Sequence, residues 1–92
     1  MQKRACQVRV FGRVQGVFLR RFLRERAQTL GLVGWVKNAE SENEVNCFAQ
    51  GHQDMIDQFL AACASGSRLA RVERVEVEKA EYNPLYCDFI IK

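Results

Sequence analysis

The sequence predicts an α+β fold in which two helices cover one face of a single antiparallel β-sheet. Two observations predict it: short segments in which apolar residues alternate, and longer segments in which they recur every three or four positions. Along the chain these segments come in the order βαββαβ, followed by a short final strand. With 92 residues, 48% of them hydrophobic and 27% charged, the chain is expected to fold as one domain over residues 1–92.

Five segments have the alternation of apolar and polar residues that indicates a strand. They are residues 6–11, 33–38, 45–50, 72–77 and 87–91. The polar residues 39–44 turn the chain between the second and the third of these strands. The apolar period over residues 72–77 is imperfect, which predicts a bulge or a shift of register in that strand.

Two segments have the apolar stripe of an amphipathic helix. The first begins near residue 17 or 18 and ends before Gly31, which suits the end of a helix because it has no side chain. The second covers residues 54–64 and is closed by the turn Ser65-Gly66-Ser67. The stripes consist of Leu19, Phe22, Leu23, Ala27 and Leu30 in the first helix and of Met55, Ile56, Phe59, Leu60 and Cys63 in the second.

This order of elements is that of the ferredoxin-like sandwich, in which two crossover connections interleave their strands in one sheet. Enzymes, RNA-binding proteins and metal chaperones all use this architecture. The fold class alone therefore predicts no function, which has to be inferred from a site.

Composition argues against several classes of protein. No apolar run approaches the roughly 20 residues that cross a bilayer, and no apolar signal segment stands near the N-terminus, so we expect a cytoplasmic protein without a membrane partner. The four cysteines, Cys6, Cys47, Cys63 and Cys87, lack the spacing of a metal site. Each is in phase with apolar neighbours, which predicts buried, reduced thiols rather than disulfides. We expect no metal and no cofactor.

Basic residues gather in the first third of the chain. Residues 1–26 contain eight lysines and arginines but one acidic residue, whereas the rest of the chain contains six basic and ten acidic residues. Such an asymmetry indicates contact with an anion, either nucleic acid or a small phosphate.

The segment from Gly12 to Val17 lies between the first predicted strand and the first predicted helix. No Ser, Thr, Asp or Asn occurs between Gly12 and Arg26 to cap the helix, so up to four backbone N–H groups lack partners. Glycines at both ends of the loop allow several N–H groups to point into one concavity, as in an anion-binding nest.

The first helical turns carry Arg20 and Arg21 where acidic residues are favoured, so a bound phosphate dianion would stabilise this helix start. The Gly-Lys-Ser/Thr of a nucleotide P-loop is missing. The alternative is an ordinary glycine turn with solvated arginines.

Two motifs resemble the signatures of the acylphosphatase family. The first is Gly12-Arg13-Val14-Gln15-Gly16-Val17-Phe18-Leu19-Arg20, and the second is Gly34-Trp35-Val36-Lys37-Asn38. The 17 residues between Arg20 and Asn38 are the spacing that the family uses, and the similarity extends from about Cys6 to Gly51.

This resemblance implies an enzyme that hydrolyses the carboxyl-phosphate bond of acyl phosphates to a carboxylate and inorganic phosphate, without a metal or cofactor. It implies two catalytic residues: Arg20, which clamps the phosphate, and Asn38, which orients the attacking water. The phosphate-binding residues that it implies are Gly12, Arg13, Val14, Gln15, Gly16, Val17 and Arg20. Inorganic phosphate is then both product and inhibitor, and we expect a monomer that binds no nucleic acid.

Two positions depart from the family pattern. Leu19 stands where the family has Phe or Tyr, which we expect to change packing, and residues 39–44 form a longer loop without the usual glycine, which we expect to change substrate affinity. Two alternatives stay open. One is a non-catalytic ferredoxin-like module that binds RNA or another polyanion, and the other is an acylphosphatase-like domain without turnover.

Overall fold

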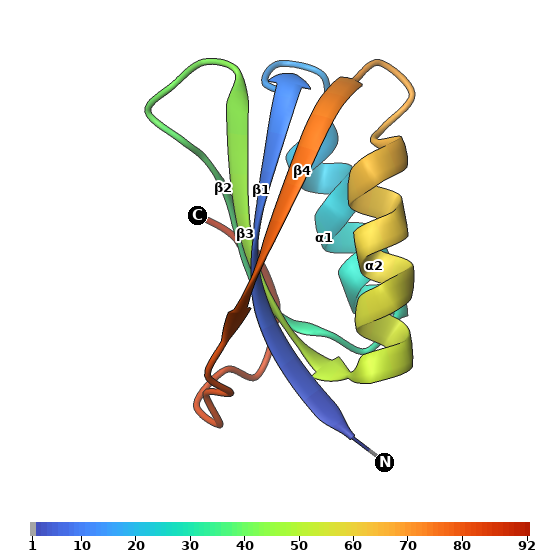
Figure 1. Ribbon diagram of the computed structural model, residues 1–92, viewed down its shortest axis with the longest axis vertical. Coiled ribbons are helices and arrows are strands. Elements are labelled where there is room, and N and C mark those ends of the chain that lie inside the picture. Colours follow the sequence, from blue (N-terminus) through green and yellow to red (C-terminus); the bar gives the residue numbers. More distant parts are fainter. Residues whose placement is uncertain (1) are drawn as a thin grey trace.

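The computed structural model describes residues 2–92, which form five strands and two helices. In chain order these are β1 (Lys3–Arg13), α1 (Leu19–Thr29), β2 (Val33–Asn38), β3 (Glu44–His52), α2 (Gln53–Ser65), β4 (Arg71–Ala80) and β5 (Phe89–Ile91). Both helices pack on the same face of the sheet (Figure 1). Every predicted element is present, and its ends differ from the prediction by at most three residues.

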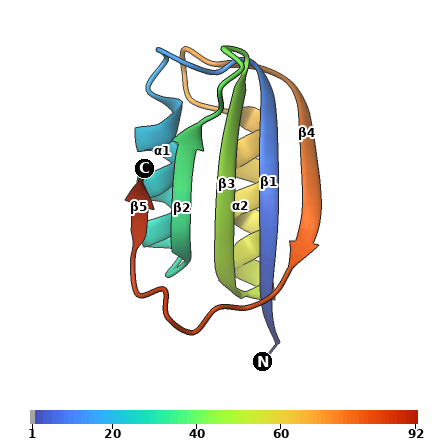
Figure 2. The same ribbon diagram turned by 90° about the vertical axis from the view of Figure 1, so that its left-hand side faces the viewer.

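The strands form one sheet in the order β4-β1-β3-β2-β5 (Figure 2). The first four strands are antiparallel to their neighbours, as predicted, but β5 runs parallel to β2, so the expectation of a wholly antiparallel sheet is wrong. The reason is the path of residues 81–88. They cross below the sheet from the end of β4, and the chain then turns back along the β2 edge in the direction opposite to β4 (Figure 2).

The irregularity predicted in the fourth strand is confirmed where β1 pairs with β4. Phe11 pairs with Arg74 and Gly12 with Val72, so one residue of β4, Glu73, has no partner opposite it. Gly12 has φ 135°, and a Cβ atom there would lie 2.2 Å from the carbonyl oxygen of Arg71. The bulge therefore requires glycine at this position.

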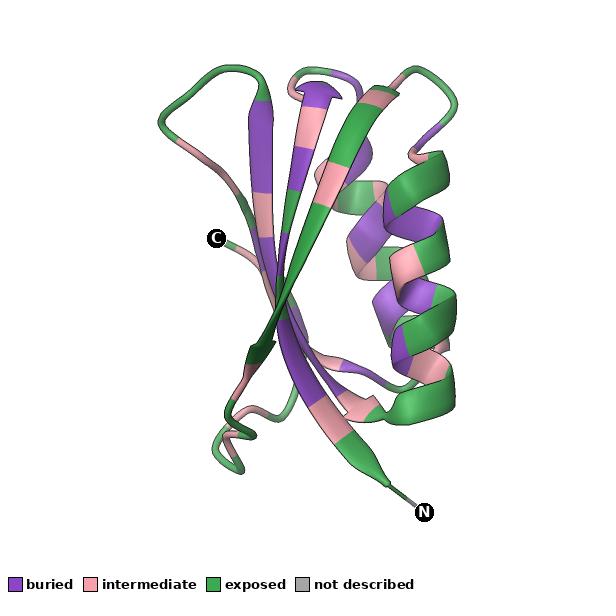
Figure 3. Cartoon of the chain, in the orientation of Figure 1, coloured by how far each residue is buried: buried purple, intermediate pink, exposed green. Residues whose placement is uncertain are grey.

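The core lies between the sheet and the two helices, where buried residues of both layers face one another (Figure 3). From β1 it receives the predicted alternate residues, Cys6, Val8 and Val10. From the helices it receives the predicted stripes, centred on Leu23 and Phe59, which are fully buried. Burying such side chains is the main favourable term in the stability of a domain of this size.

Three of the four cysteines are buried as predicted, but Cys87 is exposed. The expectation was wrong for Cys87 because the last strand begins at Phe89, so Cys87 belongs to the irregular connection before it. All four thiols are free. Burial raises the pKa of the Cys6 thiol to about 11, and a hydrogen bond with Cys63, together with burial, raises the pKa of Cys47.

Within residues 2–92, no group of three or more His, Cys, Asp or Glu side chains is arranged to hold a metal ion. In the same part of the chain, neither helix is long and apolar enough to cross a bilayer.

Candidate active site

The anion-binding loop was predicted over residues 12–17, and in the structure residues 14–18 connect β1 to α1. Gly16 and Phe18 both have left-handed backbone conformations, with φ of 72° and 61°. Phe18 is the N-cap of α1, and it makes no side-chain capping hydrogen bond. Within residues 2–92, the amides of residues 15–18 donate no hydrogen bond, and the first turn of α1 has no acidic residue. Alternation of right- and left-handed backbone is the geometry that points successive N–H groups into one concavity.

The first two residues of the predicted loop belong to the sheet instead. Gly12 and Arg13 are the last residues of β1, paired with β4, and the amide of Gly12 donates to the carbonyl oxygen of Asn43 at 3.0 Å. The Gly12 amide is therefore occupied by the fold. Any concavity of free N–H groups starts later in the loop, beyond Arg13.

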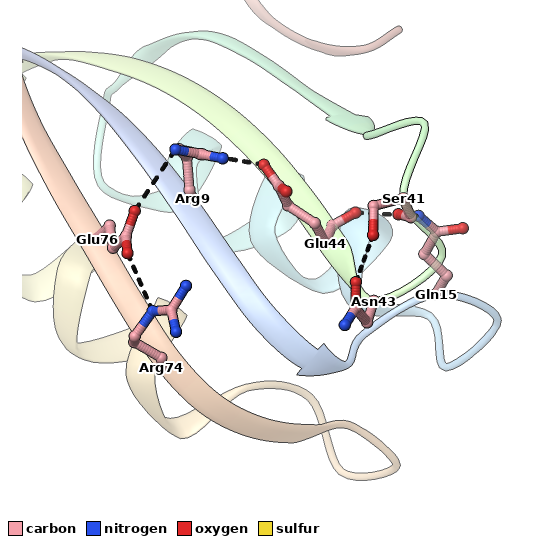
Figure 4. Close-up of polar contacts among 7 residues, drawn as sticks. All are labelled: Arg9, Gln15, Ser41, Asn43, Glu44, Arg74 and Glu76. Atoms are coloured by element: carbon pink, nitrogen blue, oxygen red, sulfur yellow. Dashed lines mark hydrogen bonds and ion pairs between the residues drawn. The ribbon is translucent and has the colours of Figure 1, made fainter.

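Gln15 joins this loop to the β2–β3 hairpin (Figure 4). Its side-chain amide nitrogen is within hydrogen-bond distance of three backbone carbonyl oxygens, those of Ala39 at 3.3 Å, Ser41 at 2.9 Å and Glu44 at 2.9 Å. An amide NH₂ group has two protons, so these three oxygens share two donors. The sequence predicted Gln15 only as part of the loop. Its hydrogen bonds to the hairpin were not predicted, because nothing in the sequence indicates that the loop contacts the glycine-free segment 39–44.

A row of charged side chains on the open face of the sheet also holds Glu44, the first residue of β3 in that hairpin. Glu44 is buried, and Arg9 donates to its carboxylate at 3.0 Å. Arg9 also lies 3.5 Å from Glu76, which accepts from Arg74 at 3.0 Å (Figure 4). A nearly buried carboxylate needs such a partner, and Glu44 thereby ties the start of β3 to β1 and β4.

Asn38 is the last residue of β2, and its side chain lies on the same face of the sheet as buried Val36, the face toward the helices. Its side-chain oxygen is buried and accepts no hydrogen bond within the described residues. The oxygen of Asn46, on the opposite face, is in the same situation. A buried amide oxygen without a donor is unfavourable by about 1–3 kcal/mol, and because Asn46 shares this feature, it does not distinguish Asn38 as a site residue.

Arg20, the second residue of α1, is half-buried and lines a cavity of about 360 Å³. The other walls of this cavity are formed by the loop residues Val14, Gly16 and Phe18 and by Leu19, Arg21 and Ile91. No carboxylate within residues 2–92 forms an ion pair with Arg20. An unpaired guanidinium beside unpaired amides makes a region of positive potential suited to an anion.

The structure thus places Arg20 and two residues of the predicted loop, Val14 and Gly16, around one cavity. Asn38 is not among the residues that line it; the hydrogen bond from Gln15 to Ala39, the next residue along the chain, links the loop to the end of β2. Arg13 is exposed at the end of β1. The remaining loop residues, Val14 and Val17, are buried and hold the loop on the core.

The aromatic residues that could have stacked on nucleic-acid bases have partners within the protein. Trp35 and Phe48 stack on the open face of the sheet with ring centroids 6.4 Å apart, and Tyr86 packs on Phe48 at 5.2 Å. Phe48 is buried as a result. Base stacking requires an exposed ring, so Phe48 is not available for it, whereas Trp35 and Tyr86 are half-buried.

The sequence as a whole is similar to that of known proteins. The profile of the Acylphosphatase family matches residues 6–91. The chain belongs to the acylphosphatase family. It is 41% identical over 88 residues to an acylphosphatase of Shewanella amazonensis, a span that covers 96% of each chain. Members of this family are hydrolases, and the family implies a small-molecule acyl phosphate as substrate.

Solved acylphosphatases share the fold over nearly the whole chain. An acylphosphatase from Coxiella burnetii is similar with a TM-score of 0.92 and 36% identity, covering 98% of this chain and 93% of that one. The acylphosphatase of Bacillus subtilis is similar with a TM-score of 0.90 and 30% identity, covering 99% of both chains. The ferredoxin-like arrangement predicted from the order of elements is confirmed by these structures.

Proposed function

We propose that this acylphosphatase binds the phosphate of its substrate at the start of α1 and hydrolyses it with Arg20 and Asn38. The observation that carries the proposal is a helix start whose N-cap makes no capping bond, beside an arginine without a carboxylate partner. Both features are unfavourable in isolation and become favourable when an anion is bound.

Phosphate binding is assigned to the loop amides and to Arg20. N–H groups of the segment 15–18 donate to phosphate oxygens, and the planar guanidinium of Arg20 donates two parallel hydrogen bonds. Val14 and Gly16 shape the cavity in which the phosphate lies. The resemblance also implied that Gly12 and Arg13 bind phosphate. We assign them a structural role instead, as the last residues of β1, since the amide of Gly12 is hydrogen-bonded to the carbonyl oxygen of Asn43.

Water activation is assigned to Asn38. Its side-chain amide oxygen is an acceptor, so it can take a hydrogen bond from the attacking water, which points an oxygen lone pair of that water toward phosphorus. An amide cannot remove the proton at neutral pH, so a phosphate oxygen takes it as the P–O bond to water forms and the P–O bond to the carboxylate breaks.

The leaving group explains why this set of residues is sufficient. Hydrolysis expels a carboxylate, whose conjugate acid has a pKa of roughly 4, so no general acid is needed to protonate it. Phosphoryl transfer depends mainly on positioning and on stabilisation of charge on the phosphoryl oxygens. Fixed amides and one guanidinium supply both, and neither a metal nor a cofactor enters the proposal.

Hydrolysis of benzoyl phosphate in the presence of EDTA tests the proposal directly. We expect turnover with inorganic phosphate as a competitive inhibitor, from a protein that sediments as a monomer. A protein that binds phosphate but shows no turnover would support the non-catalytic alternative instead. A protein that retards a single-stranded RNA, and does not bind phosphate, would support the polyanion-binding module.

A further inference from the structure

Two large hydrophobic side chains are exposed near the proposed phosphate site, one on each side of a groove. Phe18 is 70% exposed and Leu69 is 59% exposed. Both line a cavity of about 360 Å³ between the start of α1 and the turn that follows α2, with Phe22 and Val17 as its other apolar walls. The loop 14–18 and this turn lie at the same end of the sheet (Figure 2).

The groove adjoins the proposed phosphate site. Phe18 and Arg21 line both this groove and the cavity that contains Arg20 and Gly16. A ligand whose phosphate is held by the loop amides therefore lies next to the Phe18 ring, which also forms a wall of the groove. The left-handed backbone of Phe18, a conformation that costs a bulky residue of order 1–2 kcal/mol, places the ring at this junction.

The polar groups in the groove are already engaged. The hydroxyl of Ser67 donates to the carbonyl oxygen of Val17 at 2.9 Å, and the guanidinium of Arg21 donates to Glu25 at 3.2 Å. Ser67 also fixes the turn against the loop, which keeps the two walls of the groove together. Of the polar side chains that line it, only Arg68 makes no hydrogen bond or ion pair within the described residues, so the contact surface offered to a ligand is mainly apolar.

We propose that this groove binds the acyl group of the substrate, and that it selects acyl phosphates whose acyl group is apolar and larger than acetyl, such as an aryl or branched alkyl group. The proposal rests on the proposed function, because the groove gains a ligand only when the phosphate is held next to it. We identify the ligand of the groove from its position beside the phosphate site. The carbonyl carbon of the substrate is one bond from the bridging oxygen, so the rest of the acyl group must extend out of the phosphate site through its open side. Contact with Phe18 and Leu69 removes apolar surface from water and favours larger acyl groups.

The ratio of kcat/KM for benzoyl phosphate to that for acetyl phosphate tests the proposal. We expect the ratio to fall about fivefold in Leu69→Ala, equivalent to about 1 kcal/mol, and further in Leu69→Asp, which places a charge in the groove. Leu69 is exposed, so neither variant should unfold the protein. The matched control is Leu85→Ala, which removes another exposed leucine, 86% accessible and outside both cavities, and should leave the ratio unchanged.

A stable pair of ligands separates this proposal from the proposed function. In phenacylphosphonate and acetonylphosphonate a CH₂ group replaces the bridging oxygen, so neither can be hydrolysed at phosphorus. We expect the phenyl compound to bind more tightly, and Leu69→Ala to remove most of that difference. If the protein hydrolyses neither substrate, the proposed function fails. If the protein hydrolyses both substrates but Leu69→Ala changes neither the ratio of kcat/KM values nor the ratio of the two phosphonate affinities, the groove does not bind the acyl group. The same conclusion follows if Leu69→Asp converts a dimer of the chain to monomers, because the groove is then a contact between two copies.

Discussion

The side-chain amide of Gln15 donates to the backbone carbonyl oxygen of Ala39, the residue that follows Asn38. This contact, with those to Ser41 and Glu44, joins the proposed phosphate loop to the strand end that carries the proposed water-orienting residue. The two halves of the proposed site are far apart in sequence and come from different elements. We therefore expect Gln15 to act as a positioning residue for both.

Gln15→Ala should lower kcat more than it lowers phosphate affinity, because the loop amides remain while Asn38 loses its fixed position. Part-buried hydrogen bonds contribute about 0.5–1.5 kcal/mol each, so we also expect the free energy of unfolding to fall by about 1–3 kcal/mol. Urea denaturation and steady-state hydrolysis of benzoyl phosphate measure the two effects. Gln58→Ala, at an exposed position of α2, is the control and should change neither. Full activity of Gln15→Ala would contradict the positioning role.

Gly12→Ala should destabilise the protein strongly. A Cβ atom at this position would lie 2.2 Å from the carbonyl oxygen of Arg71, in a backbone conformation with φ 135°. We expect a loss of about 2–4 kcal/mol in the free energy of unfolding, measured by urea denaturation. Gly31→Ala is the control, since Gly31 has φ 70° but no atom within 4 Å of the added carbon. Its loss should be about 1 kcal/mol, and equal losses in the two variants would be evidence against the clash at the bulge.

The sequence predicted the elements well because each depends on local periodicity. The stripe around Leu23 and the alternation through Val8 both record which side of an element is buried, and both appear in the structure. The direction of β5 could not be predicted in this way. It depends on the path of residues 81–88, which lack periodicity, and the same irregular path leaves Cys87 exposed.

The site was predictable to a similar degree. Arg20 and the uncapped helix start are adjacent in sequence, so their shared cavity follows from local structure. Contacts between segments that are distant in the chain could not be predicted from the sequence. Two examples are the hydrogen bond from the Gly12 amide to Asn43 and the hydrogen bonds of the Gln15 side chain, which depend on how the β2–β3 hairpin folds over the loop. The groove between Phe18 and Leu69 could not be predicted either, because it forms between two connecting segments that only the folded sheet brings together.

The buried thiols predict a loss of stability in alkaline solution. The pKa of Cys6 is raised from an ordinary value of 9.0 to about 11 by burial, so above pH 9 the unfolded state loses its proton first. The unfolded state then binds fewer protons than the native state, and the free energy of unfolding decreases as the pH rises from 9 to 11. We expect urea midpoints to fall less over this range in Cys6→Ala than in the wild type. Identical slopes for the two proteins would exclude a contribution from Cys6.

Alkylation distinguishes the four thiols without a change of pH. Cys87 is exposed and should react with iodoacetamide in the native protein, whereas the three buried thiols should react only after unfolding. Mass spectrometry should therefore find one modified cysteine in the native state and four in urea. Because all four thiols are free, a reducing agent should change neither activity nor melting temperature. Modification of Cys47 at the rate of Cys87 would contradict the burial of the core.

Inorganic phosphate should raise the melting temperature if it binds the proposed loop. A ligand that binds only the native state stabilises it by RT ln(1 + [L]/Kd), which is about 2.7 kcal/mol at a concentration of 100 Kd. Differential scanning calorimetry with phosphate, and with chloride at equal ionic strength as control, measures the shift. An unchanged melting temperature at saturating phosphate would argue against the loop as an anion site.

The division of labour between Arg20 and Asn38 predicts two different defects. Arg20→Ala should remove phosphate binding and turnover together, because the guanidinium contacts the same oxygens in the bound substrate and in the transition state. Asn38→Ala should lower kcat severely and leave phosphate affinity close to normal, because its amide is assigned to water. Arg20→Lys keeps the charge but loses the planar pair of donors, so we expect it to be nearly as impaired as Arg20→Ala.

The control is Arg24→Ala, one turn further along α1 and outside the cavity that Arg20 lines, which should change little. Calorimetric titration with phosphate and hydrolysis of benzoyl phosphate measure all four variants. Retained turnover in Arg20→Ala, or loss of phosphate binding in Asn38→Ala, would show that the two roles are assigned wrongly.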